Sequence, residues 1–152
     1  MELPAARESG FWRRALAAMY AVIRFLDPLV RREWRSTGIG LGNIVELRVA
    51  GRRTGRYRSV LLTLLRDGER WFLGHPNGDV PWTLNLEAAG TADLKFARTV
   101  PIPIRARRLA GEDRDAPMRL FDQHPFPGNL VYRAARGHIR AVGVYFEIDR
   151  IA

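Results

Sequence analysis

The possible folds of this chain are limited most by a series of short strand-like runs, separated by tight turns, that begins at Asn43. Residues 44–49 alternate apolar and polar side chains, which is typical of a strand with one buried face. Residues 59–65 form a nearly continuous apolar run, which favours a strand covered on both faces. Asp67-Gly68 is a strong hairpin signal, and residues 71–74 return as the next strand. Such tight connections favour a mostly antiparallel sheet.

The rest of the chain adds further helices and strands. The sequence predicts helices over residues 81–89, 112–123 and 129–136, and strands over residues 92–97, 100–109 and 139–148. Pro101 and Pro103 suggest that the strand over 100–109 lies at a sheet edge, because proline cannot donate to a strand ladder. Closing the sheet on itself removes exposed edges. We therefore expect an α+β fold, a small barrel with helices packed outside.

Residues 11–35 read as a helix that bends near Pro28. One face is apolar and the other carries arginines; the apolar face comprises Trp12, Leu16, Met19, Ile23, Leu26 and Val30. This helix can pack on the barrel through its apolar face, or it can lie on an acidic membrane surface. Its uncharged runs are far shorter than the roughly 20 residues that span a bilayer. We expect no signal peptide and a cytoplasmic location, with membrane association left open.

The length of 152 residues fits one domain, which we divide into a helical region over 1–36 and a barrel body over 43–152. A formal net charge of +9 attracts anions such as nucleic acid, acidic lipid or a phosphorylated cofactor. Lys95 is the only lysine, so a codon bias toward arginine accounts for part of this charge. The chain has no cysteine, which excludes disulfides and thiolate metal sites. Its three histidines are scattered, and we expect no metal site.

The segment Gly51-Arg52-Arg53-Thr54-Gly55-Arg56-Tyr57-Arg58 lies between two predicted strands. Its two glycines allow a tight turn that exposes backbone amides, and Thr54 adds a hydroxyl. Its four arginines could hold a phosphate diester or a polycarboxylate tail by charge-assisted hydrogen bonds. The segment could equally be a solvated basic hairpin. Tyr57 is the only aromatic residue among these arginines, and therefore we expect no nucleic-acid partner.

Several motifs follow this turn in a fixed order: an apolar strand, then Arg66-Asp67-Gly68-Glu69-Arg70, then Trp82-Thr83-Leu84-Asn85-Leu86. Over residues 43–110 the chain resembles the deazaflavin-dependent nitroreductase family, which uses coenzyme F420. The resemblance implies a split β-barrel of the flavin-reductase and FMN-binding type. It also implies hydride transfer from reduced F420 to a small electron-poor acceptor, such as a quinone or a nitroaromatic compound. The protein would be a monomer or a homodimer.

The resemblance also assigns site residues by position. Arg52, Arg53, Thr54, Gly55 and Arg58 match the turn that grips the cofactor's phosphate and tail. Leu61, Leu62 and Thr63 match the strand under the deazaflavin ring, and His75, Pro76 and Asn77 match the loop that lines it. Trp82 and Asn85 match the helix beside the pocket. His75 is the candidate proton donor, although a loop histidine is more often incidental.

Other readings of these residues stay open. The family often has proline and an aromatic residue where this chain has Leu61 and Thr63, and tyrosine where it has Thr83. FMN or haem could therefore replace F420, or the barrel could bind a cofactor or anion without catalysis. The C-terminal aromatic residues could shape an acceptor site or simply pack in the core; they are Phe121, Phe126, Tyr132 and Tyr145.

Overall fold

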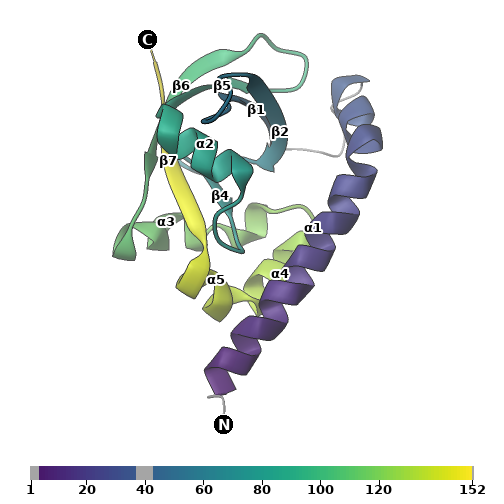
Figure 1. The fold of residues 1–152 in the computed structure, drawn as a ribbon, viewed down its shortest axis with the longest axis vertical. Helices are drawn as coiled ribbons and strands as arrows, with labels where there is room; N and C mark the ends of the chain where they lie inside the picture. The colour runs from purple at the N-terminus through teal and green to yellow at the C-terminus, as the bar shows by residue number, and fades with distance from the viewer. Residues whose placement is uncertain (1–3, 37–42, 152) are drawn as a thin grey trace.

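The computed structural model describes residues 4–36 and 43–151 (Figure 1). Within the first helix, the side chains of residues 4–8, 23–27, 30–31 and 33–36 lie outside the described part. The elements follow in this order: α1 Pro4–Ser36, β1 Ile44–Ala50, β2 Tyr57–Thr63, β3 Leu65–Asp67, β4 Arg70–His75, α2 Pro81–Ala89, β5 Thr91–Lys95, β6 Ile102–Arg108, η1 Gly111–Arg114, α3 Asp115–Met118, η2 Phe121–Gln123, α4 Gly128–Ala134, α5 Arg136–Val142 and β7 Val144–Arg150.

The seven strands form one antiparallel sheet in the order β2-β1-β5-β6-β7-β4-β3. Its two edge strands, β2 and β3, are consecutive in the chain and are joined by Leu64 alone. The opposite edges of the sheet must therefore meet at Leu64, and the sheet curls into a barrel (Figure 1). Asn43 fixes this junction, because its carbonyl accepts from the Leu64 amide at 2.8 Å and its Nδ2 donates to the Leu64 carbonyl at 3.1 Å. The expected barrel fold is confirmed.

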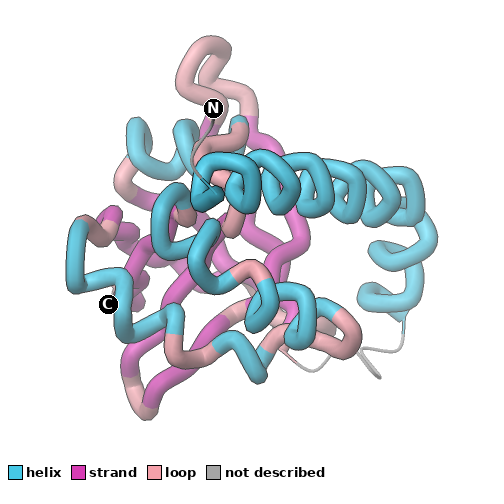
Figure 2. Tube along the Cα trace, turned by 90° about the horizontal axis from the view of Figure 1, so that it is seen from below, coloured by secondary structure: helices cyan, strands magenta, loops and turns pink. Residues whose placement is uncertain are grey.

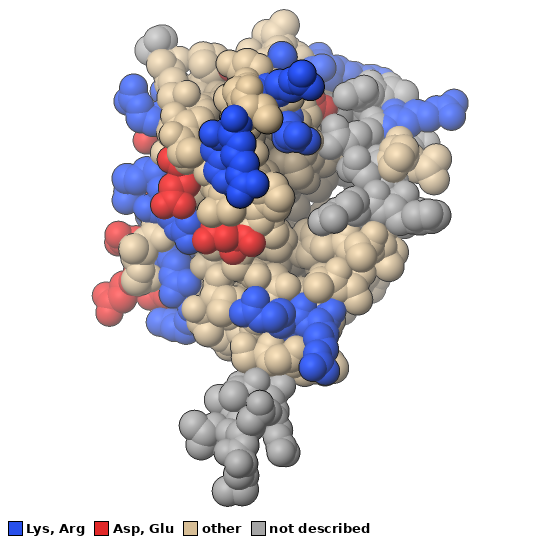
Figure 3. All heavy atoms as spheres, viewed as in Figure 1, with Lys and Arg blue, Asp and Glu red and all other residues tan. Residues whose placement is uncertain are grey.

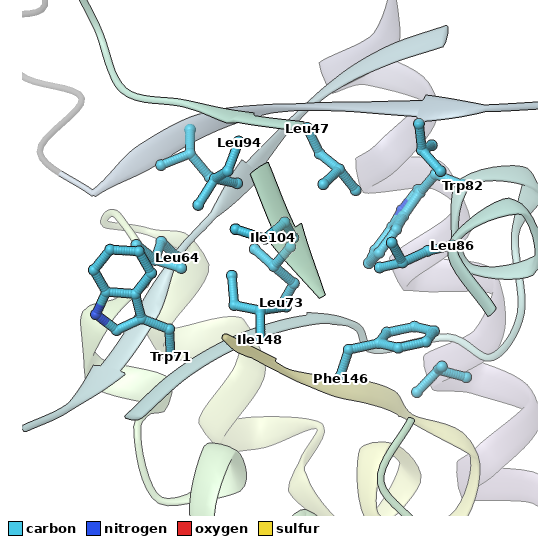
Figure 4. Packing of buried hydrophobic residues seen from close by; sticks show 13 residues of the cluster. Leu47, Leu64, Trp71, Leu73, Trp82, Leu86, Leu94, Ile104, Phe146 and Ile148 are labelled. Atoms are coloured by element: carbon cyan, nitrogen blue, oxygen red, sulfur yellow. The ribbon is translucent and has the colours of Figure 1, made fainter. Parts of the chain in front are cut away.

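The barrel is filled by apolar side chains from every strand but β3 (Figure 4). Trp71 and Trp82 lie at opposite ends of this cluster, and α2 closes one end with Trp82 and Leu86. The buried members are Val45, Leu47, Val49, Leu64, Trp71, Leu73, Trp82, Leu86, Leu94, Ile104, Val144, Phe146 and Ile148. Burial of these apolar side chains away from water is the main force that holds the barrel closed.

A second cluster lies outside the barrel, between its wall and the helices. It joins Phe72 and Tyr145 of the wall to residues of α1, α3, α4 and α5. Leu16 of α1 is fully buried there, and Trp12 and Met19 pack against the cluster. The packing role of the apolar face is thus confirmed for these three residues, whereas the side chains of Ile23, Leu26 and Val30 lie outside the described part. Pro28 lies within α1, and Figure 2 shows the helix turning toward its C-terminal end.

The strand predicted over residues 59–65 differs from the observed one. It is interrupted at Leu64, where the chain passes from one sheet edge to the other. It is also not covered on both faces: Ser59 is exposed, and residues 60–63 are half-buried. Only the inner face of β2 packs against the barrel core, through Val60 and Leu62.

The prediction that the strand containing Pro103 lies at an edge is wrong, because β6 lies between β5 and β7. Pro103 pairs with Asp93 of β5, and its carbonyl accepts from the Ile151 amide at 3.0 Å. Since the amide and carbonyl of one strand residue point to the same side, the missing N–H of Pro103 faces the end of the β7 ladder. A proline is tolerated there because it interrupts no continuing ladder.

The predicted helix over 112–123 is broken into η1, α3 and η2. Pro117 has no amide hydrogen to donate to the fourth preceding carbonyl, so a continuous helix would lose a bond there. The last strand begins at Val144 rather than at Ile139, because residues 139–142 belong to α5. Fully buried Ile139 packs in the second cluster, and its carbonyl accepts from the Gly143 amide at 2.6 Å.

Substitution of Gly74 in β4 tests the packing between the barrel strands and the second cluster. A Cβ at this position would lie 2.3 Å from Cδ1 of the Tyr145 ring, which is itself buried. We expect Gly74→Ala to lower the free energy of unfolding in urea by about 1–3 kcal/mol, as overpacking does. Gly137→Ala is the matched control, because a Cβ there meets nothing within 4 Å and alanine favours its helix. Equal stability of the two variants would contradict this packing.

Candidate functional site

The turn between β1 and β2 is closed by its own backbone. The Gly51 amide donates to the Arg56 carbonyl and the Gly55 amide donates to the Gly51 carbonyl, both at 2.8 Å. Gly55 has a φ of 70°, a left-handed conformation that glycine adopts without strain. The Arg56 amide donates to Thr54 Oγ1 at 3.3 Å. The sequence predicted a turn here, and the structure shows it to be a compact loop with a fixed path.

Asn85 of α2 attaches this turn to the rest of the molecule. Its Oδ1 accepts from the backbone amide of Arg52 at 3.1 Å and from Arg52 Nη1 at 2.9 Å. The Asn85 side chain is only 5% exposed, so these hydrogen bonds are largely shielded from water. The structure therefore brings together two predicted site residues that lie 33 positions apart in the chain. Asn85 holds the turn in place.

The turn presents a dense basic surface. Arg52, Arg53, Arg56 and Arg58 are all exposed. Figure 3 shows basic side chains gathered over the upper part of this face, where β1, β2 and α2 lie in Figure 1. Such a concentration of like charge creates a positive potential that attracts anions.

Sequence reasoning missed one contributor to this surface. The Arg48 guanidinium lies over the Tyr57 ring, with 4.7 Å between Cζ and the ring centroid, and Tyr57 is 59% exposed. The signal was present, since Arg48 occupies a polar position of an alternating strand close to the turn. Its proximity to Tyr57 depends on the pairing of β1 with β2, which sets Arg48 opposite Ser59.

An apolar strand leads away from the turn. Leu61, Leu62 and Thr63 are half-buried, and Leu62 points into the barrel core. Because side chains alternate along a strand, Leu61 and Thr63 point to the outer face. The described sheet has a neighbour for β2 on one side only. The basic turn thus continues into a partly accessible apolar strand.

The structure gives the loop after β4 a different set of contacts from those expected of a cofactor site. His75 is 8% exposed, and its ring packs against Tyr20 of α1 with 4.7 Å between centroids. Its Nδ1 lies 3.2 Å from the Gly78 carbonyl and 3.3 Å from the Asn77 amide. Pro76 is buried. The catalytic role of His75 stays a prediction.

Asn77 helps to dock α1 on the barrel. Its Nδ2 donates to the Arg13 carbonyl at 3.1 Å, and its Oδ1 lies 2.8 Å from His138 Nε2. His138 Nδ1 lies 2.9 Å from Ser9 Oγ, which completes a polar chain from α5 to α1. Trp82, also a predicted site residue, is 9% exposed and packs against Phe146 in the barrel core. Cofactor contacts of these residues remain predictions.

A group of buried aromatic and titratable side chains lies beneath α1. The hydroxyls of Tyr20 and Tyr132 lie 2.5 Å apart, and the His124 ring stacks on Tyr132 with 3.8 Å between centroids. Burial raises the pKa of Tyr20, Tyr132 and Tyr145 above the usual value for tyrosine. Burial also lowers the pKa of His124 to about 4. Tyr132 and Tyr145, whose role was left open, belong to the buried core of this region.

Comparison with known proteins places this geometry in a fold. No protein-family model matches the sequence, and no curated protein matches it in sequence. A solved structure described as a domain-swapped dimer is similar, with a TM-score of 0.55 and 18% identity over 86% of this chain and 98% of that one. An F420-H2 dependent reductase matches with a TM-score of 0.52 and 23% identity, over 69% of this chain and 93% of that one.

The heme storage protein HutZ from Vibrio cholerae has a TM-score of 0.53 and 14% identity, over 84% of this chain and 91% of that one. This chain has the split β-barrel fold. The structural similarity shows the fold, whereas identities this low do not assign a cofactor, because one barrel architecture supports several chemistries.

Asn85→Ala tests whether α2 holds the basic turn. The change removes the acceptor of both Arg52 hydrogen bonds, and we expect the free energy of unfolding to fall by about 1–2 kcal/mol. We also expect the Arg52 amide to exchange faster with solvent in hydrogen-exchange NMR. Asn129→Ala is the control, because Asn129 Oδ1 accepts a hydrogen bond from the adjacent Leu130 amide and, among the described residues, from no other donor. Unchanged exchange at Arg52 would refute this role of Asn85.

His124, whose ring stacks on Tyr132 of the second cluster, makes the stability of the protein sensitive to acid. Its pKa is about 4 in the fold and 6.5 in the unfolded chain, so the unfolded chain binds this proton more tightly. Its contribution is complete above pH 6.5 and is lost as the pH falls toward 4. Between pH 7.5 and 4.5, we expect the native protein to lose about 2–3 kcal/mol more stability than His124→Phe. The measurement is urea unfolding of both proteins across this pH range, and parallel stability profiles would exclude the effect. His138 is present in both proteins, so its contribution cancels in the comparison.

Proposed function

We propose that this protein binds coenzyme F420 and transfers a hydride from its reduced form to a small electron-poor acceptor, such as a quinone or a nitroaromatic compound. The observation that carries the proposal is the fixed basic turn, held by Asn85, that leads directly into the partly accessible apolar strand β2. The solved F420-H2 dependent reductase of the same fold supports this choice of cofactor.

The chain's own residues fit the two chemically distinct parts of such a cofactor. Arg53 and Arg58 present exposed guanidinium groups that can form charge-assisted hydrogen bonds with a phosphate diester or with carboxylates. Arg52 contributes charge beside them, while Asn85 fixes its position. Thr54 and Gly55 shape the loop that carries these cations.

The flat ring would lie along β2. Leu61 and Thr63 offer a half-buried surface on the outer face of β2, as binding of a planar heterocycle requires, and Leu62 anchors the strand from the core side. His75, Pro76 and Trp82 are buried and Asn77 is half-buried. Their part would be to hold the end of β4, the following turn and α2 against the barrel and α1.

The reduced deazaflavin supplies the hydride when it is bound, and the protein's part is to bind, orient and exclude water. The accompanying proton can come from solvent. His75 is the candidate proton donor, but the ring of Tyr20 packs against its ring. A role for His75 therefore requires that α1 move or that the proton pass through the buried group around Tyr20.

Haem binding is the second candidate function, favoured by the similar fold of the heme storage protein. The protein could also use FMN, or bind an anion without catalysis. Two other expectations remain as proposals: a monomeric or homodimeric state, and contact with an acidic membrane surface through residues 11–35. For the latter, α1 has three exposed apolar residues, Phe11, Val22 and Leu29, and the exposed arginines Arg13, Arg14 and Arg32. No helix in the described part is long and apolar enough to cross a membrane.

The proposal is tested by titrating the purified protein into F420 and following the cofactor's fluorescence. We expect saturable binding, and we expect the double variant Arg53→Ala/Arg58→Ala to bind about 100-fold more weakly, because two charge-assisted contacts are lost. The dependence of affinity on salt should also become less steep. Arg105→Ala is the matched control, since Arg105 is an exposed arginine on the distant strand β6.

Turnover is tested by the oxidation of reduced F420 with quinones and nitroaromatic compounds. Saturable binding of haem or FMN with no binding of F420 would overturn the cofactor assignment. F420 binding without oxidation by any acceptor would leave a binding protein in place of an enzyme. Equal affinity of the double variant and Arg105→Ala would reject the phosphate role of the turn.

A further inference from the structure

A second basic site lies away from the turn, between α3 and α5. A hollow of about 170 Å³ is lined there by Asp115, Met118, Arg119, Arg136 and Arg140. Figure 1 shows α3 and α5 at the end of the molecule opposite β1 and β2, so this hollow is separate from the proposed F420 site. Three arginines face one carboxylate, which leaves the hollow with excess positive charge.

Two of these arginines have unused hydrogen-bonding capacity. Within the described part of the chain, the guanidinium groups of Arg119 and Arg136 take part in no hydrogen bond or ion pair. Arg140 lies 3.4 Å from Asp115, a long and half-exposed pair. Because guanidinium groups repel one another, a bound anion would remove an unfavourable interaction as well as form new hydrogen bonds.

The walls of the hollow are fixed before any ligand arrives. Arg114 of η1 donates from Nη2 to the Arg140 carbonyl at 2.8 Å and from Nη1 to the Gly143 carbonyl at 3.0 Å. These bonds tie the segment that begins α3 to the end of α5. Met118 is 4% exposed and belongs to the outer core cluster, so it forms a rigid apolar floor. A fixed site loses little conformational entropy when it binds a ligand.

We propose that this hollow binds a phosphate group. The planar fork of arginine matches the oxygens of a phosphate in a bidentate manner, and the excess charge of the three arginines suits a dianion better than a carboxylate. The phosphate could belong to a soluble phosphorylated metabolite or to the headgroup of an anionic lipid. The proposal does not rest on F420 binding, because none of its residues belongs to the turn or to β2.

Methionine-methyl NMR reports on this hollow directly, because the chain has three methionines and only Met118 lines it. We expect the Met118 methyl signal to shift saturably when inorganic phosphate is added at constant ionic strength. The Met19 signal, from α1, should stay in place. Arg119→Gln/Arg136→Gln should weaken the binding by about tenfold or more. Arg133→Gln is the control, since Arg133 is an exposed arginine of the neighbouring α4 that pairs with Asp122.

A substitution that is expected to strengthen phosphate binding is a useful second test, because damage to the fold would weaken binding instead. Asp115→Asn removes the one repelling carboxylate and frees Arg140, so it should bind phosphate several-fold more tightly. Arg53→Ala/Arg58→Ala should leave the Met118 response unchanged, which separates this site from the turn. A Met118 shift that fails to saturate, or that is the same in Arg119→Gln/Arg136→Gln, would overturn the proposal.

Two further probes identify the source of the phosphate. Glycerol 3-phosphate represents a soluble phosphomonoester, and phosphatidylcholine vesicles containing phosphatidic acid represent a lipid headgroup. Saturable binding of the first assigns the hollow to a metabolite. Vesicle binding that the Arg119→Gln/Arg136→Gln variant loses, without binding of the first, assigns it to a lipid. Binding of neither probe would overturn the assignment of the bound phosphate to a phosphomonoester metabolite or to a lipid headgroup.

Discussion

The structure depends on a single connection, the residue Leu64 between the two edge strands β2 and β3. A sheet whose opposite edges are consecutive in the chain cannot stay flat, so it closes where Leu64 joins the edges. Asn43 stabilises the join with two hydrogen bonds, and apolar side chains fill the space that closure creates. β2 pairs with β1 along one side, and its outward-pointing Leu61 and Thr63 are half-buried.

The basic turn gains its definition from an element outside the hairpin. The pairing of β1 with β2 brings the ends of the turn together, but Asn85 of α2 sets the position of Arg52. Because α2 also closes the barrel through Trp82 and Leu86, the turn is coupled to the core. The arginines therefore extend from a rigid base, which is what distinguishes a binding loop from a solvated basic hairpin.

The segment over residues 75–79, which begins at the last residue of β4, has contacts that differ from those expected from its sequence pattern. His75 and Asn77 were expected to line a cofactor, and in the structure they contact α1 through Tyr20 and the Arg13 carbonyl. No local feature of this segment could reveal these contacts, since Tyr20 and Arg13 lie more than 50 positions earlier in the chain. Any ligand that binds at this loop must do so together with α1 or displace it.

The local elements were predictable from the residues alone: the alternating strand β1, the Asp67-Gly68 hairpin, the helix α2 and the glycine-containing turn. These follow from side-chain periodicity and from backbone conformations that glycine favours, both of which act over a few residues. The internal position of β6, the edge position of β2 and the contact of Asn85 with Arg52 became visible only in the folded molecule. Those features depend on contacts between residues far apart in the chain, which closure of the barrel at Leu64 brings together.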